Sequence, residues 1–337
     1  MMAIDLALVL CASCAGVAFA GGWLFARLAG RRGWVDAPEH RRLHRTPTPR
    51  GGGIGIAAVL ATVVFAAYAK GGPGVSLAGG LLVTAGAGLV DDIRPLAPAA
   101  KLFAQAVGTL PLALAWPLAP QLATPVPGIV AAWLLAIGLV NAWNFMDGSN
   151  GLVTLQALLL GACVAAVLPA TDAGGAVAWA LVAACIGFLP LNFPRARVFL
   201  GDVGSHALGF AAALLLLQAA ARGGATAALV WLPLSAVLID AGVTLGGRLR
   251  RGCIPWQAHR DHLYQRIIAA GVGHSAVALA FASWTLVVVG LAVALAAGGA
   301  DPSLAWAVAG GVYGVGVVTR LAAGYRWPIT EPPESKA

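Results

Sequence analysis

Apolar runs long enough to cross a bilayer as helices recur along almost the whole chain, and they set the limits on its fold. Hydrophobic residues make up 60% of the sequence and charged residues only 10%, with a mean hydropathy of +0.85. Too little polar surface remains to cover a water-soluble globule of 337 residues. The sequence therefore predicts an all-α, polytopic integral membrane protein. About eleven runs are expected to span, near residues 4–28, 53–69, 75–90, 100–116, 127–141, 152–168, 174–191, 205–221, 225–246, 276–297 and 303–321.

The first apolar run is predicted to stay in the mature protein as a helix. The letters "AFA" at 18–20 imitate a signal cleavage site, but no basic segment precedes the run, and Arg27, Arg31 and Arg32 follow it. We therefore expect the N-terminus outside and, after eleven spans, the C-terminus in the cytoplasm. Residues 1–325 are expected to form a single transmembrane domain, followed by a cytoplasmic tail at 326–337.

The basic residues support this orientation. The side predicted to face the cytoplasm holds 19 of the 21 Lys and Arg, all except Lys70 and Arg222. Of these, 17 lie in the polar segments and the tail, and Arg27 and Arg320 lie at the adjoining ends of apolar runs. The net charge of +8 is therefore mostly a property of one face, which suits anionic lipid or a phosphorylated ligand and does not argue for nucleic acid. The five cytoplasmic segments are residues 30–52, 91–101, 141–151, 192–204 and 247–275.

The first two of these segments carry charges that could meet a phosphate. Asp91 and Asp92 end an apolar run, with Lys101 just beyond, and burying such a pair costs several kcal/mol unless a cation compensates. A solvated loop that closes a helix is the alternative. Upstream, "HRTPTPRGGG" places His44 and Arg50 before glycines 51–53, whose N–H groups at a helix start are expected to face an anion. A basic membrane tether is the alternative there, and we prefer it for Arg31, Arg32 and Arg45.

The next two segments are rich in side-chain oxygens. In "NAWNFMDGSNGL", Asn141, Asn144, Asp147 and Asn150 recur every third residue, so a helical or tightly turned backbone would collect them along one edge. Such a set suits a hard cation or the edge of a base, although a turn that satisfies its own backbone is an alternative. Asp202 lies between glycines after Phe199, which is typical of a metal ligand on a constrained turn or of a helix N-cap.

The last segment gathers histidine and arginine. The spacing in "HRDHLYQR" predicts an amphipathic helix that turns His259, His262 and Arg266 toward one ligand, with Arg260 beside them. Asp240 is an acid inside an apolar run, which predicts a functional role or pairing with an arginine. Together, the five segments offer oxygens for Mg²⁺ and basic groups for phosphates, which is the equipment of phosphoryl transfer at a membrane surface.

These motifs resemble one family across nearly the whole chain, the polyprenyl-phosphate N-acetylhexosamine-1-phosphate transferases. "DAPEHRRLHRTPTPRGGG" is similar to the family's D-x-P-x-x-R-x-x-H-x-x-P-x-P-R-x-G-G segment, and "DDIRPLAPAAKL" to its D-D-x-x-x-L-x-P-x-x-K. "NAWNFMDGSNGL", "RVFLGDVGSHALG" and "HRDHLYQR" resemble three further signatures. The resemblance implies transfer of N-acetylhexosamine-1-phosphate from a UDP-sugar to undecaprenyl phosphate, with release of UMP, at the bacterial cytoplasmic membrane. It also implies the start of O-antigen or a related surface polysaccharide.

The resemblance also implies a role for each site residue. Asn144 and Asp202 would hold Mg²⁺, or Mn²⁺, on the donor. Phe199 would stack on uracil, with Asn150 bonding its edge. Asp91, Asp92 and Lys101 would be catalytic, with the two acids placing the lipid phosphate and Lys101 contacting phosphate. The other substrate-binding residues would be His44, Arg50, Asp147, His259, Arg260, His262 and Arg266.

Two departures from the family pattern bear on specificity. Asn150 stands where bacterial members usually have Asp, and "HLYQR" replaces the frequent H-I-H-H-R, a variant similar to O-antigen initiators that take modified N-acetylhexosamines. The identity of the UDP-sugar and a homodimeric state stay open. A polytopic transporter or lipid flippase is the alternative class, but it is expected to place polar residues near the bilayer midplane rather than at one face.

The predicted orientation can be tested by cysteine labelling in intact cells. In a background without the native cysteines, Leu96→Cys and Gln257→Cys should resist an impermeant thiol reagent, because both positions are expected in the cytoplasm. Gly72→Cys and Asp172→Cys should react. Labelling of Leu96→Cys without permeabilisation would contradict the orientation.

Overall fold

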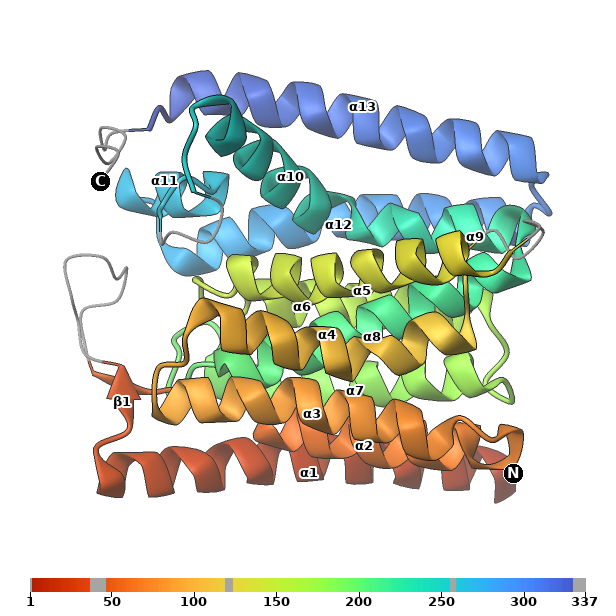
Figure 1. Ribbon diagram of the computed structural model, residues 1–337, viewed down its shortest axis with the longest axis horizontal. Helices are drawn as coiled ribbons and strands as arrows, with labels where there is room; N and C mark the ends of the chain where they lie inside the picture. Colours follow the sequence, from red (N-terminus) through yellow and green to blue (C-terminus); the bar gives the residue numbers. More distant parts are fainter. Residues whose placement is uncertain (1, 37–46, 119–123, 255–258, 330–337) are drawn as a thin grey trace.

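The chain folds into a bundle of helices that run side by side (Figure 1). The computed structural model describes residues 2–36, 47–118, 124–254 and 259–329. Within these residues, eight segments are long and apolar enough to cross a membrane. The prediction of an all-α, multi-pass membrane protein is confirmed. The helices are α1 (Met2–Arg32), α2 (Ile54–Tyr68), α3 (Gly74–Ile93), α4 (Pro98–Ala115), α5 (Val126–Met146), α6 (Leu152–Val167), α7 (Ala173–Asn192), α8 (Gly201–Arg222), α9 (Gly224–Trp231), α10 (Ser235–Arg250), α11 (Leu263–Ala269), α12 (His274–Ala297) and α13 (Pro302–Arg326), with 3₁₀ turns η1 (Ala69–Gly71) and η2 (Leu232–Leu234).

Each of the eleven apolar runs lies in helix, but the ninth is interrupted. Helix α9 passes through η2 into α10, and Pro233 stands at the interruption. Proline has no N–H to bond the carbonyl four residues earlier, so a helix bends or changes pitch there. The single span expected near residues 225–246 is thus two helices joined by a turn.

A short β-pair, which the sequence did not predict, precedes α2. Strands β1 (Val35–Asp36) and β2 (Thr48–Pro49) pair antiparallel, with Val35 opposite Pro49 and Asp36 opposite Thr48. An isolated parallel bridge joins the next residue, Arg50, to Phe199. The pair therefore ties the chain before α2 to the chain before α8.

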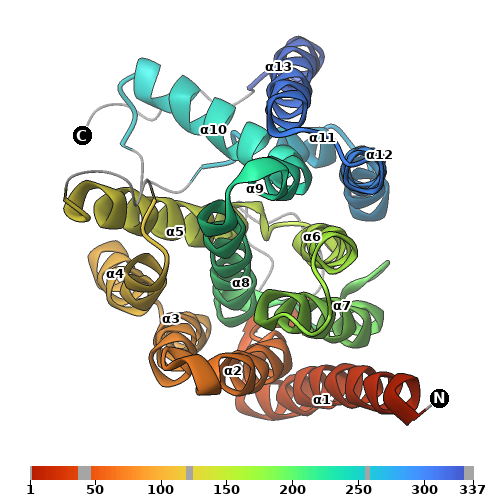
Figure 2. The ribbon, with the colours of Figure 1, turned by 90° about the vertical axis from the view of Figure 1, so that its right-hand side faces the viewer.

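Helix α8 is the centre of the bundle (Figure 2). Every residue from Gly201 to Ala219 is buried, on all sides of the helix. A helix that is apolar all round belongs in an interior of this kind. The polar residues Asp202 and His206 in its first two turns are therefore buried as well, and the protein must supply their partners.

Glycines let α2 and α3 approach the first turn of α8 closely. A Cβ added at Gly53 would lie 2.2 Å from the Cα of Gly204, and one at Gly88 would lie 2.4 Å from the backbone of Asp202. Small residues allow such backbone contact between membrane helices. These contacts fix the position of Asp202 along the bundle relative to the start of α2 and the last turns of α3.

The polar segments meet at one end of the bundle, which we call the polar end. It holds the β-pair and the connections α3 to α4, α5 to α6, α7 to α8 and α10 to α11, whereas the start of α1 and the turn from α12 to α13 lie at the other end (Figure 1). Contacts between Arg50, Asp92 and Asp202 join three of these segments. The side of the membrane that the polar end faces stays a prediction.

The close approach of α2 to α8 predicts that an added methyl group destabilises the protein at the contact but not at a position outside it. Gly53→Ala should lower the apparent Tm in detergent, because overpacking costs about 1–3 kcal/mol and here the clash is with backbone. The matched control is Gly79→Ala in α3, where an added Cβ meets nothing within 4 Å. The control should be neutral or more stable, since alanine favours a helix interior over glycine by about 0.5–1 kcal/mol. Equal Tm values for the two variants would contradict the packing argument.

Candidate active site

The carboxylate of Asp202 is the centre of the site. It lies buried in the first turn of α8 and pairs with two cations from distant segments. Arg50 Nη2 donates to Asp202 Oδ1, and Lys101 Nζ lies 3.3 Å from Asp202 Oδ2. Burial opposes the charge of Arg50, but Asp202 and then Asp92 more than offset it and raise the pKa of the guanidinium. Arg50 is therefore a permanent cation here.

Asp92 serves as the cap of α8. Its Oδ1 accepts the N–H of Asp202 at 2.8 Å, and its Oδ2 accepts the N–H of Val203 at 3.0 Å. The side chain is 0% exposed, and Arg50 Nε lies 3.0 Å from Oδ1. A carboxylate at a helix N-terminus satisfies orphan N–H groups and complements the helix dipole. The alternative role of Asp202 as an N-cap is therefore wrong, because Asp92 from another helix occupies that position.

Asp91, the other member of the acidic pair, holds the turn between α3 and α4. Its Oδ1 accepts the N–H of Leu96 at 2.7 Å, and its Oδ2 lies 3.0 Å from Lys101 Nζ. Lys101 thus bridges Asp91 and Asp202. The two adjacent aspartates point to different partners, so the pair is no solvated loop.

The N–H groups of glycines 51–53 are not free for an anion, and that expectation is wrong. Gly51 and Gly52 donate to the carbonyl of Phe199, and Gly53 donates to the carbonyl of Leu200 at 2.8 Å. The glycines are needed for space and conformation instead. Gly51 has a φ of +110°, which side chains rarely adopt, and Gly53 meets Gly204.

Asn144 and Asp147 bring further oxygens to this centre from the end of α5. Asn144 Nδ2 donates to Ser205 Oγ at 3.2 Å, one turn from Asp202. Burial raises the pKa of Asp147 well above its usual range; Arg50 lowers it, and the charges of Asp202 and Asp92 raise it further. The ionised form of Asp147 is therefore disfavoured by its surroundings.

The charge balance fits a divalent cation. Four carboxyl groups gather here, those of Asp91, Asp92, Asp147 and Asp202, around the two cations Arg50 and Lys101. With all four ionised, the carboxylates would outnumber these cations by two. Carboxylate and amide oxygens are the ligands that Mg²⁺ prefers. Among the residues that the structure describes, no three His, Cys, Asp or Glu side chains form a preformed metal cage. An ion with few protein ligands, such as Mg²⁺ on a phosphate, matches this set.

A buried hydrogen-bond network that sequence reasoning missed lies beneath Asp202. His206 Nδ1 lies 3.1 Å from the carbonyl of Thr84, and its Nε2 lies 3.2 Å from Gln105 Nε2. Gln105 Oε1 accepts from Asn141 Nδ2 at 2.7 Å. Since a carbonyl only accepts, His206 carries its proton on Nδ1. The network links α3, α8, α4 and α5, and the polar letters inside apolar runs were the signal for it.

The histidines form a second cluster, without the predicted helix. Residues 259–261 are not helical, and α11 begins at Leu263 with His262 as its N-cap. The rings of His259 and His262 stack with centroids 5.1 Å apart. Burial and then His262 lower the pKa of His259 to about 4, and burial likewise lowers the pKa of His262. Both rings are therefore neutral at pH 7 in the protein without ligand.

Tyr264 joins the histidine pair to the aspartate centre. Its hydroxyl donates to the carbonyl of Phe145 at 3.0 Å, at the end of α5 that carries Asn144 and Asp147. Its ring stacks with His262 at 5.9 Å. A Cβ at Gly148 would lie 2.3 Å from the tyrosine hydroxyl, so glycine is required beside it. The histidines thus lie against the same end of α5 as the aspartate centre.

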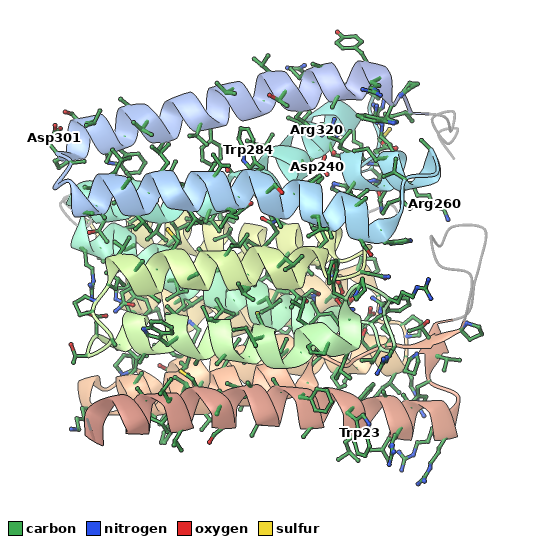
Figure 3. The ribbon with its side chains drawn as sticks, turned by 180° about the vertical axis from the view of Figure 1, so that it is seen from behind. Trp23, Asp240, Arg260, Trp284, Asp301 and Arg320 are labelled. Carbon is green, nitrogen blue, oxygen red and sulfur yellow. The ribbon has the colours of Figure 1, made fainter. Side chains whose placement is uncertain are left out.

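Asp240 pairs with an arginine, as one of its two interpretations predicted, and the partner is Arg320 of α13. Arg320 Nε lies 2.6 Å from Asp240 Oδ1, which also accepts the N–H of Leu263 at 2.9 Å (Figure 3). This buried pair anchors the start of α11. Arg266 does not turn toward the histidines as expected, because its Nη2 donates to the carbonyl of Gly324 at 2.6 Å and it lines the space between α10 and α13.

The remaining predicted residues occupy the rim. Phe199 is half-buried beside Arg50, and Asn150 Nδ2 donates to the carbonyl of Pro194 at 3.2 Å. Arg260 lies at the polar end, on the connection to α11 (Figure 3). His44 lies outside the described residues. Direct contacts therefore gather Arg50, Asp91, Asp92, Lys101 and Asp202.

Comparisons with known proteins agree with these motifs. The profile described as glycosyl transferase family 4 matches residues 75–220. A decaprenyl-phosphate N-acetylglucosaminephosphotransferase of Mycobacterium tuberculosis is 30% identical over 309 residues, which cover 77% of this chain and 75% of the relative. The enzyme of the same name from Mycolicibacterium smegmatis is 31% identical, covering 79% and 76%. An undecaprenyl-phosphate alpha-N-acetylglucosaminyl 1-phosphate transferase of Escherichia coli is 27% identical, covering 73% and 72%. The chain therefore belongs to the polyprenyl-phosphate N-acetylhexosamine-1-phosphate transferases of glycosyl transferase family 4.

Proposed function

We propose that this protein transfers N-acetylhexosamine-1-phosphate from a UDP-sugar to undecaprenyl phosphate on the cytoplasmic face of a bacterial inner membrane. The products are undecaprenyl-diphosphate-sugar and UMP, and the reaction starts O-antigen or a related surface polysaccharide. The observation that most directly supports this proposal is the contact of five charged residues at one end of a membrane bundle, namely Asp91, Asp92, Asp202, Arg50 and Lys101. Membership of the family supports the reaction class.

In the proposed reaction, an oxygen of the lipid phosphate attacks the β-phosphorus of the donor. The bond from that phosphorus to the bridging oxygen breaks, and UMP leaves with the oxygen. A phosphate monoester has a second pKa near 6, so it is largely ionised at neutral pH and needs no strong base. The task of the protein is therefore to place and neutralise phosphates, which is the main contribution in phosphoryl transfer.

The site residues divide this task by position. Lys101, which bridges Asp91 and Asp202, would contact the phosphates on both sides of the reacting bond. Asp91 would hold Lys101 in position, and Lys101 would in turn contact the phosphate of the acceptor. Asp92, fully buried and bonded to the first N–H groups of α8, acts as a positioning residue that holds Asp202.

A divalent cation fits the donor side of the site. Asp202 and Asn144, with Asp147 beside them, would hold Mg²⁺, which would supply positive charge to the donor pyrophosphate. His262 lies beside Phe145 at the same end of α5 and stacks on His259, and the two rings would contact the pyrophosphate or sugar. Phe199 and Asn150 at the rim would contact uracil.

The reaction class is tested by assaying purified protein with undecaprenyl phosphate and UDP-linked GlcNAc, GalNAc, FucNAc and QuiNAc. At least one donor should release UMP, only with the lipid present, and removal of divalent cations should stop the release until Mg²⁺ is restored. Release of UDP instead of UMP would mean that the sugar moves without its phosphate, which would contradict the proposal.

The division between donor and acceptor sides predicts different effects of two substitutions. Asp202→Asn should weaken Mg²⁺-dependent binding of the UDP-sugar as well as turnover. Asp91→Asn should lower turnover by about a hundredfold, the scale of a lost positioning or acid–base group, and leave donor affinity within a few fold. Calorimetry with and without Mg²⁺ measures the affinities. Loss of donor binding in Asp91→Asn, with binding retained in Asp202→Asn, would reverse the assignment.

A further inference from the structure

A cleft of about 710 Å³ separates α10 from α13 near the polar end. Figure 2 shows α10 leaving the bundle between α5 and α13. We call this space the α10–α13 cleft. One part of its wall is apolar, and the other is basic. The apolar residues include Ile239, Val243, Val317 and Leu321, and the basic residues are Arg250, Arg251, Arg266 and Arg320.

The carboxylates near the cleft do not match its arginines. Arg320 pairs with Asp240. Arg251 and Arg248 both pair with Asp261. Arg250 and Arg266 have no ion pair with a carboxylate among the residues that the structure describes. Burial and then Arg320 lower the pKa of Arg266, as expected where positive charge is in excess.

A smaller cavity of about 240 Å³ adjoins the cleft and extends the basic surface. The two spaces share Asp261, Arg266, Pro328 and Ile329. The smaller cavity adds Arg260, Arg326 and the ring of Trp327. Tryptophan and arginine at the end of a membrane helix are typical of the level of lipid headgroups.

We propose that the α10–α13 cleft binds an acidic phospholipid of the surrounding bilayer. The phosphate would lie among Arg250, Arg266 and Arg326, and an acyl chain would cover the apolar wall. Basic pockets between transmembrane helices recognise acidic headgroups in this way. The site belongs to a resident lipid and not to the acceptor, because none of Arg50, Asp91, Asp92, Lys101 and Asp202 lines the cleft.

Lipid binding is tested on the full-length protein, freed of native lipid in detergent, by native mass spectrometry with phosphatidylglycerol or phosphatidylcholine. Phosphatidylglycerol should bind at least tenfold more tightly. Arg250→Gln combined with Arg326→Gln should weaken its binding about thirtyfold, since each arginine near a lipid phosphate contributes roughly fivefold. Both side chains are exposed, so the fold should persist. The control is Arg31→Gln at the end of α1, on the far edge of the bundle, which should bind normally.

Several outcomes would overturn the proposal. Equal binding of the two lipids, or equal weakening in the Arg31→Gln control, would leave no specific site. Competition by inorganic phosphate as strong as that by phosphatidylglycerol would indicate a site for a soluble anion. Loss of a dimer in the double variant, with lipid binding unchanged, would make the cleft a surface between two copies.

A kinetic measurement separates the resident lipid from the acceptor. The double variant, supplied with saturating phosphatidylglycerol, should keep the wild-type KM for undecaprenyl phosphate. A raised acceptor KM with phosphatidylglycerol binding intact would assign the cleft to the acceptor and overturn the proposal. The mass-spectrometric result does not depend on transferase activity, so failure of the proposed function would be recognised separately.

Discussion

Burial of an acidic cluster at the start of α8 is the constraint on which the rest of the structure depends. Isolated charges in a low-dielectric interior cost several kcal/mol each, so the fold must bring cations and N–H groups to them. Arg50 arrives from the chain before α2, Lys101 from the start of α4, and the two amides from α8 itself. Segments that are 152 residues apart in the sequence are held together by this requirement.

The positions of the helices along the chain could be predicted well from the sequence because apolar length alone defines a membrane span. All eleven expected runs lie in helix. The errors lie where local chemistry overrides length. Pro233 is the sequence signal for the break between α9 and α10, but it lies inside an apolar run that is otherwise continuous. The pairing of Val35 with Pro49 depends on contact with the chain before α8, which no local pattern shows.

The residues of the site were easier to predict than their partners. Asp91, Asp92, Lys101, Arg50 and Asp202 were identified from charge at the ends of apolar runs, and they do meet. Which of these residues pair with one another depends on the tertiary structure. Nothing in the letters "DD" tells that one aspartate caps α8 and the other holds a lysine.

Three other sequence interpretations depended in the same way on neighbours far away in the sequence. The N–H groups of glycines 51–53 were assigned to an anion because the carbonyls of Phe199 and Leu200 could not be foreseen beside them. The helix expected around His259 is absent, and α11 begins instead at Leu263, whose N–H bonds Asp240 of α10. Likewise, the carbonyl of Gly324 on α13 draws Arg266 away from the histidines.

The glycine contacts around α8 and the interruption at η2 affect two different parts of the site. Where backbone touches backbone, as at Gly53 and Gly204, neither helix can slide or rotate without a clash, so the aspartate centre has a fixed geometry. The interruption at η2 separates α10 and α11, with His262, from α9. The donor proposed above would therefore meet one set of residues fixed by backbone contact and another carried on a separate helical segment, and differences in the sugar would fall to the second set.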